Sequence, residues 1–164
     1  MDMLRIVTGA PIWVWPLLGL LIWMGVRNLA ERRAPVWTLA ILPLIGGILA
    51  PARIVGAPSV TAGAIVYLIS ATILLWPGIR AAQTIDAAFD RAAGRITLPG
   101  SPFTLVLGLS IFFVSYAFGV LFALRPDLAA DPLIALVPVA IGGALMGFTA
   151  GRQGFLYSRY LRDA

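Results

Sequence analysis

Five stretches of this chain are apolar and long enough to cross a bilayer, and this feature restricts the fold more than any other. A membrane-spanning helix needs about 20 apolar residues to cross a hydrocarbon core roughly 30 Å thick. None of the five stretches contains Asp, Glu, Lys, Arg or His, and they cover residues 6–26, 36–52, 59–79, 102–124 and 132–151. We therefore predict one transmembrane domain, residues 1–164, folded as an all-α bundle of five membrane helices.

The amino-acid composition excludes several kinds of chemistry. The sequence has no cysteine, no histidine and no lysine, and all twelve basic residues are Arg. Disulfides, thiolate nucleophiles, His-ligated metals and Schiff bases therefore have no residues to form them. The sequence also contains no triad, phosphate-binding or dinucleotide motif. We expect no enzymatic activity, no metal and no cofactor, and we expect no nucleic-acid partner.

The arginines predict how the chain is oriented. The segments 27–35, 80–101 and 152–164 would lie on one side and together hold nine Arg and four acidic residues, which gives the whole net charge of +5. The segments on the other side are neutral overall. By the positive-inside rule the charged side is cytoplasmic. This predicts an N-terminus on the outer side and a cytoplasmic C-terminus, with anionic lipid head groups near the arginines.

The last span carries a motif for close helix packing. Gly143, Gly147 and Gly151 recur every four residues, with Gly142 beside them. Small residues at this spacing let two helix backbones approach each other in lipid. The stripe could pack against another span of the same chain, which we favour, or it could form the seam of a homodimer.

Prolines followed by glycine pairs occur in two spans. Pro43 precedes Gly46 and Gly47, and Pro138 precedes Gly142 and Gly143. Broken helices in opposite halves of a membrane protein are a pointer to transporter sites. Hydroxyl groups at membrane depth would add polar atoms to such a site. The candidate hinge or pocket residues are Pro43, Gly46, Gly47, Tyr67, Ser110, Tyr116 and Pro138.

Residues 80–101 form the longest segment outside the spans, and two structures suit them. One is an interfacial helix with Ile85 and Phe89 in lipid. The other is a hairpin of strands 84–91 and 95–98 with Gly94 at a positive φ angle. A mixture is also compatible, in which a helical extension of span three precedes a short hairpin. The segment's charged candidates are Asp86, Asp90, Arg91 and Arg95. Two carboxylates are too few to hold magnesium against a diphosphate, so we expect a solvated loop with local ion pairs.

The stretch from Arg91 to Gly119 resembles a family of small, uncharacterised bacterial inner-membrane proteins with four to five spans. The resemblance rests on the sequence LPGSP at 98–102, followed by the aromatic run FFVSYAFGV, and on APIWVWPLL near the start. It implies a multi-pass membrane protein and no particular activity.

Two functions are compatible with these observations. The first is a structural or interaction protein that associates with itself or with a membrane partner through its helix faces, and we favour this one. The alternative is a carrier or pore for a neutral or lipophilic small solute, which would use the broken spans.

Overall fold

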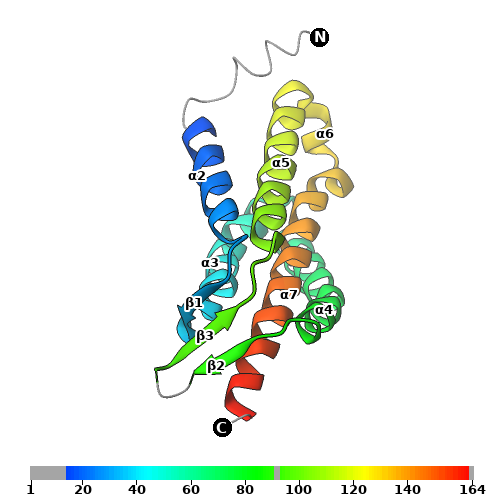
Figure 1. The fold of residues 1–164 in the computed structure, drawn as a ribbon. Coiled ribbons are helices and arrows are strands. Elements are labelled where there is room, and N and C mark those ends of the chain that lie inside the picture. The colour runs from blue at the N-terminus through cyan, green and yellow to red at the C-terminus, as the bar shows by residue number, and fades with distance from the viewer. Residues whose placement is uncertain (1–13, 91–92, 163–164) are drawn as a thin grey trace. The chain divides into compact units, whose positions relative to one another are not determined.

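The structure is a computed structural model that describes residues 14–90 and 93–162. The chain divides into two compact units, one formed by Met1–Arg32 and Gly100–Pro126, the other by Arg33–Pro99 and Asp127–Ala164. Figure 1 labels the helices and strands of both units.

The first unit is an antiparallel pair of helices, α2 (Val14–Arg27) and α5 (Phe103–Leu124). Gly25 lies against Leu105, and Leu21 lies near Gly108, so the two helices run in opposite directions. The Ser101 amide donates to the Asn28 carbonyl at 3.0 Å and ties the entry of α5 to the exit of α2. The first predicted span, 6–26, lies partly outside the described residues. A bundle of five spans therefore stays a prediction.

The second unit contains most of the remaining helices. A 3-10 turn, η1 (Val36–Ala40), runs directly into α3 (Ile41–Val55), which is followed by α4 (Val60–Gln83). A short helix, α6 (Pro126–Ala130), precedes the long α7 (Pro132–Arg162). Across the described part of the chain, four helical stretches are long and apolar enough to cross a membrane: Val36–Val55, Val60–Gln83, Phe103–Leu124 and Pro132–Arg162.

Three of these helices run further than their predicted spans, and α4 ends at Gln83 instead of residue 79. Helix α3 continues to Val55 instead of ending at residue 52, so it includes Arg53. Helix α7 continues to Arg162 instead of ending at residue 151. The added length of α7 carries apolar side chains on one face, and their burial against other elements favours continuing the helix. The added lengths carry charge that the predicted spans lack: Arg53 in α3, and Arg152, Arg159 and Arg162 in α7.

Residues 80–101 continue span three as the last turn of α4 and then form a short hairpin, as the mixed alternative predicted. Strand β2 (Ala88–Asp90) pairs antiparallel with β3 (Arg95–Leu98), with Phe89 opposite Ile96. Gly94 has a φ of 60°, which an L side chain rarely adopts. A third strand, β1 (Arg32–Pro35), lies on the other side of β3, which gives the order β1-β3-β2.

The small sheet covers a compact core at one end of the second unit (Figure 1). Ile96 of β3 and Leu156 of α7 are completely buried there. Ile85 and Phe89 are partly buried against this core, and Phe89 belongs to strand β2 and not to the helix that the interfacial alternative required. The buried members are Val36, Leu39, Ala82, Ala87, Ile96, Leu98 and Leu156.

Candidate functional site

The closest helix contact in the second unit is the crossing of α4 and α7, and the glycine stripe forms it. A Cβ atom added to Gly143, Gly147 or Gly151 would collide with the backbone carbonyls of Tyr67, Ala71 and Leu75 respectively. Both sets of residues advance by four along the chain in the same order, so α4 and α7 run parallel. The glycine Cα–H groups therefore face carbonyl oxygens of the neighbouring helix, a weak hydrogen-bonding geometry common at such interfaces.

This packing bears on the homodimer hypothesis. The glycine face of α7 is occupied by α4 of the same chain, and Gly78 of α4 in turn lies against the Phe148 carbonyl of α7. A dimer seam through these glycines would require α4 to leave. Any self-association of the folded unit must therefore use other helix faces.

Helix α3 joins this pair through a small group of polar side chains. Tyr67 of α4 is only 6% exposed, and its hydroxyl donates to the Gly46 carbonyl of α3 at 3.4 Å. Ser70 donates to the Val66 carbonyl within its own helix at 2.8 Å. A Cβ on Gly46 would lie 2.6 Å from the Met146 sulfur of α7. Gly46 thus marks the place where all three helices meet.

Arg53 is the charged member of this group. It follows the predicted span 36–52 directly, in what the sequence predicts to be a short connection to the next span. Its Nη1 atom donates to the Pro138 carbonyl of α7 at 3.4 Å. A Cβ on Gly142 would lie 2.9 Å from Arg53 Cδ and 3.3 Å from Nε. The missing side chain at Gly142 therefore makes the space in which the arginine lies along α7.

The structure thus brings together several of the predicted pocket residues, but these residues are packed against one another or against Met146. Gly46, Tyr67 and Pro138 lie around the three-helix crossing, together with Gly142 and Gly143. Gly47 faces open space. We name the set Arg53, Tyr67, Ser70, Pro138 and Gly142 the crossing cluster.

Pro43 lies in the first turn of α3, directly after the 3-10 turn η1 and within the helical stretch Val36–Val55. Among the described residues, Pro51 in α3, Pro77 in α4 and Pro138 in α7 lie inside helices.

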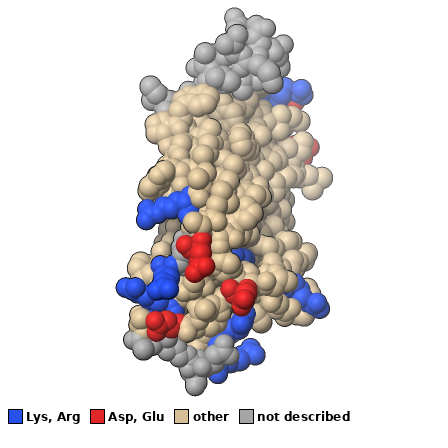
Figure 2. Space-filling model, viewed as in Figure 1, with Lys and Arg blue, Asp and Glu red and all other residues tan. Residues whose placement is uncertain are grey.

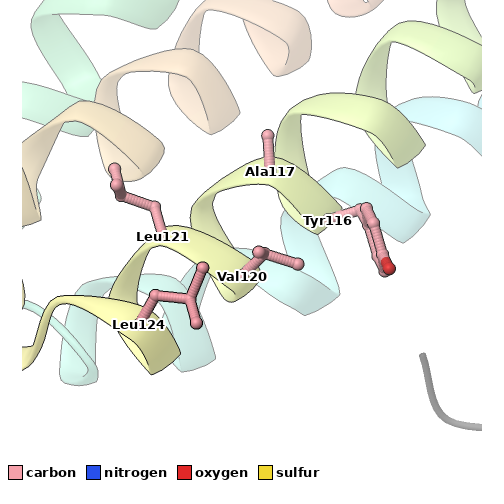
Figure 3. Close-up of a pocket in the computed structure, with 5 residues that line it drawn as sticks. All are labelled: Tyr116, Ala117, Val120, Leu121 and Leu124. Carbon is pink, nitrogen blue, oxygen red and sulfur yellow. The ribbon is translucent and has the colours of Figure 1, made fainter. Parts of the chain in front are cut away.

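Ser110 and Tyr116, the remaining pocket candidates, belong to α5 in the first unit. Tyr116 stacks on Phe112, with ring centroids 6.2 Å apart and planes at 2°. Tyr116 also borders an open hollow of about 370 Å³, together with Ala117, Val120, Leu121 and Leu124. Figure 3 shows that all five residues come from the same helix. The hollow is apolar apart from the Tyr116 hydroxyl and has no converging polar groups that would orient a ligand.

The charged loop residues do not form a metal site. Asp86 lies between α4 and β2, while Asp90 ends β2 opposite Arg95, so the two carboxylates do not share a helix face. Asp90 Oδ1 accepts from the Ala93 amide at 3.1 Å and stabilises the turn. Arg91 lies outside the described residues. Within the part of the chain that the structure describes, no group of three or more Asp or Glu side chains could hold a metal ion.

A second polar group, at the sheet end of α7, was not predicted. Thr149, Arg152 and Gln153 are all buried, and Gln153 Oε1 has no hydrogen-bond partner among the described residues. Arg159 donates to the Ile85 carbonyl at 3.1 Å and lies over the Phe89 ring, 5.8 Å from its centroid. Arg152, Gln153 and Arg159 lie in the segment 152–164, which the sequence predicts to lie outside the spans.

Comparison with known proteins identifies the family but gives no activity. No curated protein and no solved structure matches the chain. The sequence resemblance pointed to an uncharacterised family, and that much is confirmed. The chain belongs to the family of unknown function DUF6622, whose model matches residues 1–164.

Proposed function

We propose that this protein is a multi-pass protein of the bacterial inner membrane with a structural or interaction role. In this proposal it associates with itself or with a membrane partner through its helix faces. The N-terminus would be periplasmic and the C-terminus cytoplasmic.

The observation that carries this proposal is the apolar surface of the long helices. Leu133 is 79% exposed and Ile48 is 73% exposed, and large apolar side chains are also exposed along α4 and α5. A water-soluble monomer rarely exposes continuous apolar surface of this extent. Lipid tails, or the helices of a partner, are the surroundings that suit such side chains.

The distribution of charge supports the orientation. In the second unit, Figure 2 shows charged side chains gathered around the strands and the C-terminal end of α7. Two tryptophan–arginine pairs mark helix ends: Arg80 lies 4.8 Å from the centroid of Trp76, and Arg27 lies 5.6 Å from that of Trp23. Such pairs are typical of membrane–water interfaces, where anionic head groups meet the hydrocarbon.

The crossing cluster favours an interaction role over a carrier role. The residues that would have lined a transport pathway at the Pro138 break are in contact with one another or with Met146. A carrier needs a site that opens in turn to each side, and the tight α4–α7 contact leaves no room for one between these two helices.

The experiment that separates the two roles uses purified protein in liposomes. We expect no saturable flux of neutral or lipophilic solutes, and we expect chemical crosslinking in native membranes to trap a defined oligomer or a defined protein partner. Saturable flux that Tyr67→Phe or Pro138→Ala abolishes would contradict the interaction role and favour the carrier. Tyr157→Phe, at a half-exposed position of α7 outside the crossing cluster, serves as the matched control for Tyr67→Phe.

A further inference from the structure

Arg53 is a charged side chain among apolar helices, and its hydrogen-bonding capacity is mostly unused. A guanidinium group has five N–H donors. Among the described residues, Arg53 makes one hydrogen bond, the 3.4 Å contact of Nη1 with the Pro138 carbonyl. This contact is longer than the usual range for an N–H···O bond and is therefore weak.

The position of Arg53 makes such weak hydrogen bonding of a charged side chain unusual. Pro138 lies six residues after the start of α7, which is about 9 Å along the helix axis. Arg53 lies at the end of α3 far from the sheet, and its side chain reaches back along α7 over Gly142. Ionisable groups at this depth are costly unless another group pairs with them, and they mark functional sites more often than structural ones.

Two carboxylates of the second unit lie near the start of α7: Asp127 in α6, and Asp131. Asp131 caps α7, because its Oδ1 atom accepts from the Leu133 amide at 2.8 Å and from the Ile134 amide at 3.3 Å. Among the described residues, the hydrogen bond that Arg53 makes goes to the Pro138 carbonyl and not to either carboxylate.

We propose that Arg53 binds the phosphate of an anionic phospholipid at the seam between α3 and α7. The planar guanidinium suits the oxygen atoms of a phosphate, which accept two parallel N–H bonds. Leu49, one turn before Arg53, is 50% exposed and apolar, and Val137 beside Pro138 is also exposed. These neighbours would contact acyl chains, and this favours a lipid phosphate over a soluble one.

This inference depends on the proposed membrane location, but it goes beyond the general attraction of lipids to the charged end of the protein. It assigns one lipid to one side chain, at the opposite end of the second unit from the strands. If the proposed location is wrong, the protein will fail to fractionate with membranes after carbonate extraction. If only the lipid site is wrong, the protein will remain in membranes but show no specific lipid binding.

The test is native mass spectrometry of the detergent-purified protein titrated with phosphatidylglycerol, phosphatidylcholine of the same chains, and inorganic phosphate. We expect one tightly retained phosphatidylglycerol molecule and no comparable retention of phosphatidylcholine or phosphate. Arg53→Gln should weaken this binding about tenfold, as expected from the loss of hydrogen bonds to a charged group. Arg53→Lys should have a smaller effect because it keeps the charge but loses the planar donor set.

Arg80→Gln is the matched control. Arg80 lies over Trp76 in the last turn of α4, at the opposite end of the second unit from Arg53. This variant should leave the tightly retained lipid in place. Equal losses in the two glutamine variants would indicate general electrostatic attraction and would overturn the proposal. If Arg53→Gln does not fold, the wild-type titration decides: equal retention of the two lipids, or binding of inorganic phosphate alone, would overturn it as well.

Discussion

At the scale of single residues, glycines decide how closely the helices of the second unit approach. The sequence shows that Gly143, Gly147 and Gly151 share a helix face, and the structure shows what that face contacts. Gly154 lies on the same helix but has no atom near its Cβ position. The two kinds of glycine should therefore respond oppositely to the same substitution.

We predict that Gly147→Ala destabilises the protein by about 1–3 kcal/mol, because the added methyl group meets the Ala71 carbonyl. Gly154→Ala should be neutral or stabilise the protein by about 0.5–1 kcal/mol, because alanine has the higher helix propensity and nothing opposes it. Thermal unfolding in detergent, followed by circular dichroism, measures both. A loss of stability of the same size in both variants would contradict the close α4–α7 contact.

Arg159 connects the last turns of α7 to the segment that leads into the hairpin. We predict that Arg159→Gln loses the hydrogen bond to the Ile85 carbonyl and the contact with the Phe89 ring. The cost should be about 1 kcal/mol, and chymotrypsin should cut near Phe89 faster. Arg162→Gln, on an exposed residue in the same turn, is the control. Unchanged cleavage in Arg159→Gln would show that this contact does not hold the sheet in place.

At the scale of elements, much of the fold could be predicted from the sequence. Long apolar runs identify membrane-length helices because the hydrocarbon core fixes their length. The start of α7 was also predictable, since Asp131 precedes Pro132 and caps the helix as its side chain allows. The hairpin followed from Gly94, a residue that tolerates a positive φ angle.

Other elements had no local signal. Strand β1 has the sequence RRAP, which lacks the β-branched and aromatic residues typical of strands, and it exists because β3 supplies a hydrogen-bonding edge. The extension of α7 past Gly151 depends on burial of Leu156 in a core built from distant segments. The contact between Arg53 and Pro138 joins residues 85 positions apart, and no spacing rule reaches that far.

The hairpin should unfold separately from the helix crossing. We predict that Gly94→Ala costs roughly 1 kcal/mol, because alanine resists a φ of 60°. Hydrogen exchange should accelerate in β2 and β3 and stay unchanged at the centre of the α4–α7 crossing. Faster exchange at Ala71 or Gly147 would show that the sheet and the crossing form one cooperative unit.

At the scale of the whole molecule, the proposed function depends on how the chain crosses the membrane. The helix directions are consistent with alternating crossings, because α4 and α7 are parallel. The hydrogen bonds from Tyr67 to Gly46 and from Arg53 to Pro138 place α3 antiparallel to both. In the first unit, α2 and α5 are antiparallel, as a first and a fourth span would be. The proposed orientation then follows from the excess of arginine on one side.

The most direct test of the membrane account uses the absence of cysteine from the sequence. Single cysteines placed at exposed Ser59, Thr84, Ala130 and Leu161 would be probed with a membrane-impermeant maleimide in intact spheroplasts and in inverted vesicles. We predict labelling of Ser59 and Ala130 positions from the periplasmic side, and of Thr84 and Leu161 positions from the cytoplasmic side. Labelling of Thr84 or Leu161 positions in intact spheroplasts, or of all four positions from one side, would contradict the account.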